Sequence, residues 1–164
     1  MSNRLELVAN GDREIIMTRI FDASPDLVFD ALTIPALLQR WLKGPDGWSL
    51  ETCDIDLRVG GAYRYVWKNE DGGELAMGGT YREITRPERI SQTEMFDGNW
   101  TGGEAISTAT LEPFGGRTRL TTTVLYASPE SRDGAIQSNM EAGITASYAR
   151  LDSVLADEQQ ETAR

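Results

Sequence analysis

The alternation of hydrophobic and polar residues divides the chain into parts with different periods. Between about Arg13 and Asp22, a run rich in β-branched residues predicts a strand. Ser24-Pro25-Asp26 then offers a capping hydroxyl and a proline suited to a first helical turn, and Pro35 begins a second helical pattern that ends before Gly44. Two short helices are therefore predicted directly after the first strand.

The period changes to two from Trp48 to about Tyr126, a region punctuated by five Gly-Gly pairs. Gly72-Gly73 and Gly115-Gly116 separate strand-like runs and predict hairpin turns, whereas Gly78-Gly79 falls inside a run and predicts a bulge or bend. The predicted strands lie near residues 48–58, 62–69, 74–85, 88–96, 104–112 and 117–126. Connections this short permit only antiparallel pairing, since a parallel crossover needs a dozen or more residues.

The last part predicts one long helix over about residues 129–156, because apolar residues recur there every three or four positions. The stripe consists of Ile136, Met140, Ile144, Tyr148, Leu151 and Leu155. Gly143 and Ser147 lie beside this stripe, and their small size predicts a close approach of the helix to the sheet or to a ligand. The polar tail, residues 157–164, is expected to fray.

These elements predict an α+β fold of one domain, residues 1–164, with a core from about residue 12 to residue 156. A curved antiparallel sheet of six or seven strands would wrap around the long C-terminal helix, with the two short helices between the first two strands. A helix that crosses a curved sheet need not fill the space beneath it. A cavity is therefore expected between the helix and the concave face of the sheet.

Composition and charge exclude several classes of function. The net charge of −10 repels phosphate backbones, so nucleic acid and anionic membranes are not expected as partners. No apolar run approaches membrane-spanning length, and the N-terminus lacks the apolar stretch of a signal peptide. Cys53 is the single cysteine, which is typical of a reducing compartment, and together these features predict a cytoplasmic protein.

The sequence offers no recognisable catalytic or metal-binding constellation. It contains no histidine, which excludes imidazole-based catalysis and removes the commonest metal ligand. The spacing from Gly73 to Gly78 matches a phosphate-binding loop, but Gly79 stands where that loop needs lysine. Cys53 has no histidine to activate it and is expected to be a small buried residue. We therefore predict no catalytic residue, no metal and no cofactor, and an enzyme is less expected than a binding protein.

Several stretches of the chain resemble the START/Bet v 1-like (SRPBCC) superfamily, in particular its branch homologous to the activator of the ninety-kilodalton heat-shock protein ATPase. They are Phe21–Leu32, Leu38–Trp41, Asp56–Arg64, Gly79–Ile84 with Pro87–Ile90, and Met140–Gly143 with Ser147–Leu151. The resemblance implies a helix-grip fold with a cavity beneath the last helix. The chain departs from the family where Ile34, rather than a capping acid, precedes Pro35, so Thr33 is the candidate cap of the second helix.

An aromatic row provides the first candidate site residues. Tyr63, Tyr65 and Trp67 alternate with other residues, so all three leave the same face of one strand. Met77 and Tyr81 have the matching parity on the next strand. Two interpretations account equally for such a row. The three rings either pack in an ordinary core or line an apolar cavity. The family resemblance favours the cavity.

Glu94 is the one candidate carboxylate, and it shares its parity with Phe96. If this face is concave, the Glu94 carboxyl enters an apolar space and its pKa rises through desolvation. Such a group suits an acid, a base or an anchor for a ligand. The alternative is that Met95 faces inward and Glu94 lies in solvent.

The remaining cavity candidates are three tryptophans and one side of the last helix, namely Trp41, Trp48, Trp100, Met140, Gly143, Ile144 and Ser147. Trp100 lies in a glycine-rich loop, where it either folds back on the protein or acts as a mobile lid. Trp41 and Trp48 either border the opening of the cavity or pack between the helices and the sheet.

The sequence thus predicts a protein that binds a small hydrophobic or aromatic molecule between the sheet and the last helix. Two alternatives stay open. Superfamily relatives that include cyclases and aromatases imply a cavity enzyme that uses Glu94 and the tyrosines. The named branch implies a chaperone-associated interaction module in a stress response, although nothing else in the sequence supports a chaperone partner. A homodimer is also left open.

Overall fold

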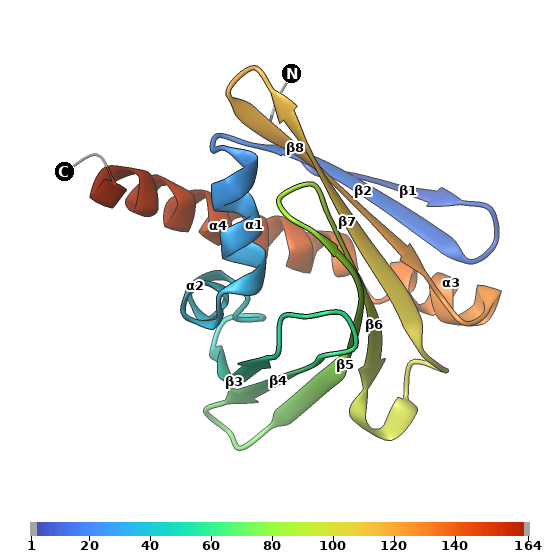
Figure 1. Ribbon diagram of the computed structural model, residues 1–164. Helices are drawn as coiled ribbons and strands as arrows, with labels where there is room; N and C mark the ends of the chain where they lie inside the picture. The colour runs from blue at the N-terminus through green and yellow to red at the C-terminus, as the bar shows by residue number, and fades with distance from the viewer. Residues whose placement is uncertain (1–2, 163–164) are drawn as a thin grey trace.

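The computed structural model describes residues 3–162, which form one antiparallel sheet of eight strands with helices along its concave side (Figure 1). The strands are β1 (Glu6–Asn10), β2 (Glu14–Phe21), β3 (Trp48–Ile55), β4 (Ala62–Asn69), β5 (Glu74–Thr85), β6 (Arg89–Phe96), β7 (Ala105–Phe114) and β8 (Arg117–Leu125). The helices are α1 (Pro25–Thr33), α2 (Pro35–Trp41), α3 (Pro129–Gln137) and α4 (Met140–Thr162), with a 3₁₀ turn at Asp97–Asn99. The strand order is β1-β2-β8-β7-β6-β5-β4-β3, and the predicted α+β helix-grip fold is confirmed.

The sheet has one strand more than the sequence pattern predicts. β1 forms a hairpin with β2, and Gly11 takes a φ of +60° in the turn between them. Most of β1 is exposed, because it is an edge strand and its residues are mostly polar or small. The alternation that indicates a half-buried strand is therefore weak in this segment.

The C-terminal segment forms two helices rather than the single helix predicted. α3 ends at Gln137, and Asn139 takes a left-handed backbone conformation with φ of +64° before α4 begins. This break changes the direction in which the preceding residues face. Ile136 consequently falls outside the apolar stripe and is exposed.

α4 continues to Thr162, so the prediction of a frayed tail was wrong for residues 157–162. Gln159 donates a hydrogen bond of 2.9 Å to the Asp22 carbonyl, and Arg40 of α2 pairs with Glu158 at 3.2 Å. These contacts hold the last turns of the helix against the rest of the fold. Residues 163 and 164 lie outside the described part of the chain.

The two short helices begin in different ways. Ser24 caps α1 as predicted, and its Oγ accepts a hydrogen bond of 3.3 Å from the Leu27 N–H. α2 has no side-chain cap, because the Thr33 hydroxyl donates to the Phe29 carbonyl within α1 at 2.8 Å. The prediction of Thr33 as a cap was therefore wrong. α2 begins with Pro35, whose missing N–H leaves one fewer donor to satisfy.

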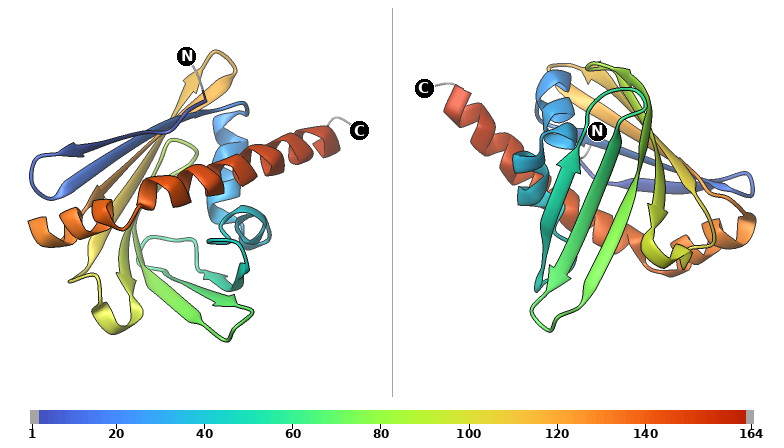
Figure 2. Two further views of the ribbon diagram at one scale, coloured as in Figure 1. Left: turned by 180° about the vertical axis from the view of Figure 1, so that it is seen from behind. Right: turned by 60° about the horizontal axis from the view of Figure 1, so that its bottom comes forward.

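α1, α2 and the second half of α4 lie together over one end of the sheet (Figure 2). A hydrophobic core fills the region between these helices and the sheet. Its fully buried side chains include Phe21, Val28, Phe29, Leu111, Leu120 and Leu151. Arg19 on β2 ties α4 to the sheet through two hydrogen bonds to Asp152, of 2.8 and 2.6 Å. The second half of α4 is therefore held firmly over the sheet.

The ladder of paired residues between β5 and β6 is interrupted directly after Gly78, at Gly79 and Thr80. A Cβ on Gly79 would lie 2.0 Å from the Thr93 carbonyl oxygen, so only glycine fits at this position. The Thr80 N–H donates to the Thr93 hydroxyl at 2.9 Å, and the Thr93 carbonyl accepts a hydrogen bond of 2.5 Å from the Tyr63 hydroxyl. The glycine pair thus lets an aromatic residue of β4 reach across β5 to β6.

Candidate functional site

Four aromatic side chains form a continuous row on the concave face of β4 and β5. We name Tyr63, Tyr65, Trp67 and Tyr81 the aromatic wall. Ring centroids lie 5.5 Å apart for Tyr81 and Tyr63, 5.0 Å for Tyr63 and Tyr65, and 5.8 Å for Tyr65 and Trp67. All four residues are less than a tenth exposed, and Met77 lies beside Tyr65 in the sheet. The parity argument therefore placed these residues on the correct face.

The polar groups of the aromatic wall are the Trp67 indole N–H and the tyrosine hydroxyls, which are either hydrogen-bonded or uncharged at neutral pH. The Trp67 indole N–H donates to the Leu42 carbonyl at 2.9 Å, and the Tyr63 hydroxyl is bound to β6 as described above. Burial raises the pKa of the Tyr63, Tyr65 and Tyr81 hydroxyls well above the usual value for tyrosine. The wall therefore presents uncharged, ordered rings at neutral pH.

Glu94 lies near the centre of the sheet and faces the same concave side. It shares this face of β6 with Gln92 and Phe96 and pairs with Ala105 on β7. Met95 is exposed on the opposite face. The alternative in which Met95 faces inward is therefore wrong.

No described residue forms a hydrogen bond or an ion pair with the Glu94 carboxyl. Burial raises its pKa to about 7, and no described residue offsets this shift with a hydrogen bond or a positive charge. The side chain is only half-buried, and no unpaired side-chain oxygen in the described chain is fully shielded from solvent. The oxygens of Glu94 therefore face a space that water can enter.

The side chains on the concave face around Glu94 and on the inner side of the first half of α4 are half-buried rather than fully buried. They are Glu94, Phe96, Ser107 and Tyr126 from the sheet side and Met140, Ile144 and Ser147 from α4. Under the second half of α4, by contrast, Leu111, Leu120 and Leu151 are at most 2% exposed. α4 thus covers one end of the concave face completely. We name the other part, which carries the half-buried residues given above, the open end.

Trp41 and Trp48 lie away from the open end. The Trp41 indole N–H donates to the Ala31 carbonyl at 2.9 Å, and its ring packs against Tyr148 with centroids 6.1 Å apart. Trp48 is half-buried and lies close to Gly44. For Trp41 the structure favours packing between helix and sheet over a position at an opening.

Trp100 is the most exposed of the candidate residues, at 64%. Its ring packs on Phe96, with centroids 5.1 Å apart. The loop that carries it starts at an ion pair between Arg64 and Asp97, which lie 2.6 Å apart. Trp100 therefore folds back onto a residue of the concave face while most of its ring stays in solvent.

Gly143 does not approach the sheet closely, and this prediction was wrong. A Cβ added to Gly143 would meet no atom within 4 Å, and the residue is exposed. Met140 and Ile144 are the α4 residues of this region that pack toward the core. A helical pattern identifies neighbours of a stripe, but it does not give the distance between the helix and its partner.

We expect Gly143→Ala to raise the free energy of unfolding by up to about 1 kcal/mol, because alanine favours the helix and has room there. Urea denaturation measures the change. Gly134→Ala in α3 is the matched control, since a Cβ there also meets nothing within 4 Å. A loss of stability in Gly143→Ala alone would contradict the open surroundings of Gly143.

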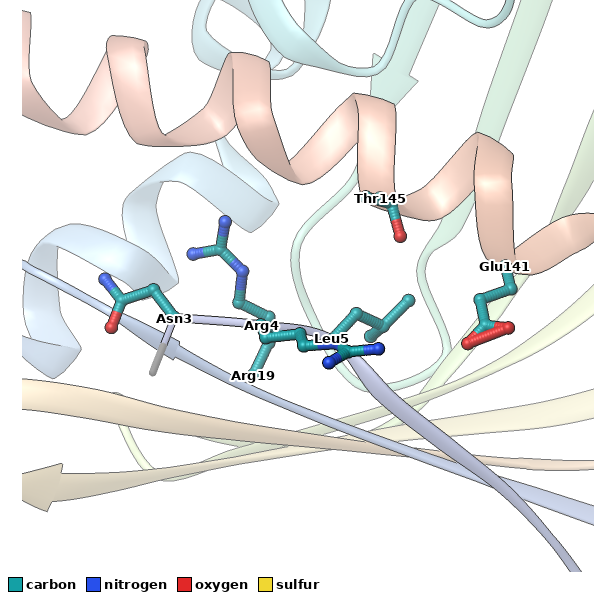
Figure 3. Close-up of a pocket in the computed structure, with 6 residues that line it drawn as sticks. All are labelled: Asn3, Arg4, Leu5, Arg19, Glu141 and Thr145. Atoms are coloured by element: carbon teal, nitrogen blue, oxygen red, sulfur yellow. The ribbon is translucent and has the colours of Figure 1, made fainter. Parts of the chain in front are cut away.

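Two surface clefts flank α4, and neither is lined by the aromatic wall. One of about 430 Å³ lies between the N-terminal segment and the first half of α4, lined by Asn3, Arg4, Leu5, Arg19, Glu141 and Thr145 (Figure 3). The other, of about 360 Å³, lies beside α2 and is lined by Arg40, Lys43, Arg150, Ser153, Val154 and Asp157. Arg19 and Arg40 are bound to carboxylates, and Arg150 donates to backbone carbonyls. These guanidinium groups serve the packing of α4.

Sequence analysis missed Ser107 and Tyr126 at the open end. Ser107 pairs with Gln92 across β6 and β7, and Tyr126 continues the inward parity of Val124 on β8. Burial, together with the charge of Glu94, raises the pKa of Tyr126 to about 12. The register between predicted strands was the signal that could have identified both residues.

The described residues also limit other kinds of site. Among residues 3–162, no three His, Cys, Asp or Glu side chains converge on a point where a metal ion could bind. No helix in this range is long and apolar enough to cross a bilayer. Burial and the charge of Asp54 raise the pKa of the Cys53 thiol to about 11, so this thiol stays protonated at neutral pH.

Comparison with known proteins assigns the family. The family described as activator of Hsp90 ATPase homolog 1-like protein matches residues 22–156. The chain belongs to this family. The resemblance to the Bet v 1-like superfamily, and to this branch of it, is thereby confirmed.

Solved structures agree with this assignment. A protein from Rhodobacter sphaeroides is 32% identical, with a TM-score of 0.89 over 94% of this chain and 99% of its own. An AHSA1 protein from Silicibacter pomeroyi is 25% identical, with a TM-score of 0.71 over 88% of this chain and 99% of its own. A protein from Nitrosomonas europaea, 23% identical with a TM-score of 0.81 over 93% of this chain and 99% of its own, shares the fold. Among curated proteins, none matches the chain.

Proposed function

We propose that this member of the family binds a small hydrophobic or aromatic molecule at the open end, between the aromatic wall and the first half of α4. The observation that carries the proposal is the Glu94 carboxyl, which is deep in the fold, unpaired and accessible. An unpaired carboxyl in such a position destabilises the folded protein. A ligand that donates a hydrogen bond to this carboxyl would offset that loss of stability.

The surroundings of Glu94 suit a ligand with a flat or chain-like apolar body. The aromatic wall is rigid, uncharged and lies on the same face of the sheet. Met140 and Ile144 offer apolar surface from the opposite side. Sites for small molecules commonly combine such apolar lining with a few polar groups that fix orientation.

Native mass spectrometry of freshly purified protein tests this function directly, and we expect a bound small molecule. An uncharged apolar dye, Nile red, should also bind and gain fluorescence. We expect Tyr65→Ala to stay folded, to lose less than the roughly 3–5 kcal/mol typical of a large aromatic residue in a solid core, and to bind the dye with changed affinity.

Leu57→Ala is the matched control, because Leu57 is exposed on the loop between β3 and β4. This variant should bind Nile red as the wild type does. Absence of both an adduct and dye binding, together with an unfolded Tyr65→Ala variant, would contradict the proposed function and favour an interaction module.

A second candidate function, an acid–base enzyme, is favoured by one specific observation. The Glu94 carboxyl has a pKa of about 7 and lies near the protonated hydroxyls of Tyr63 and Tyr126, whose pKa values its charge raises. A carboxyl that titrates near neutral pH can both accept and donate a proton. Mass spectrometry separates the two functions, since a binding protein returns an added ligand unchanged and an enzyme does not.

A further inference from the structure

The Glu94 carboxyl has no counter-ion within the described chain, because the interior arginines are already bound. Arg19 is held by Asp152 and by the Ile20 carbonyl. Arg132 of α3 donates to the carbonyls of the β1–β2 hairpin. Arg150 donates to the carbonyls of Trp41, at the end of α2, and of Gly44, in the loop that follows. A positive charge that pairs with Glu94 would therefore come from outside the described residues.

Aromatic rings lie on several sides of this carboxyl. The sheet register places Tyr63 opposite Gly79 on β5 and Glu94 opposite Ala105 on β7, and Tyr126 follows β8 at the level of Ala105, so tyrosines flank Glu94 on both sides of the concave face. Aromatic faces attract cations through their negative quadrupole. A carboxylate together with several tyrosine rings is the combination that favours an organic ammonium group.

We propose that the ligand is an organic cation, in which a protonated amine pairs with Glu94 and an apolar or aromatic body lies against the aromatic wall. This inference rests on the proposed binding function and specifies its ligand class. The net charge of −10 also favours the approach of cations over anions. A neutral hydroxylated ligand would satisfy the same carboxyl only in part, since it supplies no charge.

A pair of probes of nearly equal shape tests the charge requirement, namely 1-naphthylmethylamine and 1-naphthylmethanol. Isothermal titration calorimetry at pH 8 measures both affinities for the full-length protein. We expect the amine to bind about tenfold more tightly than the alcohol, as one charge-assisted hydrogen bond and a cation–π contact provide. In Glu94→Gln, the two affinities should become equal to within about twofold, with most of the change in the amine.

Glu104→Gln is the matched control, because Glu104 is exposed and its charge also reaches Tyr63. This variant should keep the tenfold preference for the amine, since it leaves the carboxyl of Glu94 in place. Equal binding of both probes to the wild type would overturn the cation assignment and leave ligand binding standing. The same holds for a preference that survives in Glu94→Gln. Binding of neither probe would overturn both proposals.

Discussion

Replacing Leu151 by alanine should lower the free energy of unfolding by about 2–5 kcal/mol, the range for large-to-small changes in a solid core. Leu151 is fully buried on the inner side of α4 and belongs to the hydrophobic core. The cavity left behind would not collapse easily, because Arg19 and Asp152 hold this part of α4 at a fixed height over the sheet. Urea denaturation at neutral pH measures the effect.

Ile144→Ala provides the matched comparison on the same helix. Ile144 is half-buried over the open end, so truncation removes few contacts and opens no enclosed cavity. We expect a cost below about 1.5 kcal/mol. Equal losses from the two variants would show that both ends of the concave face are solid, which contradicts the open end.

Much of the fold follows from local patterns in the sequence. The strands from β3 to β8 alternate strictly enough that their faces could be assigned, and the glycine pairs at 72–73 and 115–116 lie in hairpin turns as predicted. β1 was missed because an exposed edge strand needs no apolar alternation. The break at Asn139 was missed because nothing in the spacing of apolar residues marks a single left-handed residue between two helices.

The candidate site was predictable only in part, for a different reason. Parity fixed which side of a strand faces inward, and this suffices for the aromatic wall and for Glu94. It does not fix how near a helix comes to the sheet, so Gly143 was misplaced. It also does not show that the Trp41 indole N–H donates a hydrogen bond to a carbonyl of α1. Distances between elements depend on the packing of all side chains together, which a linear pattern does not contain.

Glu94→Gln should stabilise the ligand-free protein by about 3 kcal/mol at pH 8 and have much less effect at pH 5. The pKa of Glu94 is raised from 4.5 to about 7 in the folded state, mainly by burial. Between these values the unfolded chain releases the proton while the folded chain retains it. The free energy of unfolding therefore falls as the pH rises from about 5 to 8, and glutamine, which carries no charge, removes this loss.

The difference between wild type and Glu94→Gln at each pH isolates this group, because all other titrations are common to the two proteins. Tyr63, Tyr65 and Tyr126, which lie near Glu94, have raised pKa values and stay neutral over this range. A difference that does not change with pH would show that Glu94 is solvated normally. Saturating 1-naphthylmethylamine should stabilise the wild type at pH 8 by about 1.4 kcal/mol more than the variant, the equivalent of its tenfold tighter binding, because a bound cation stabilises the ionised carboxyl and lowers its pKa.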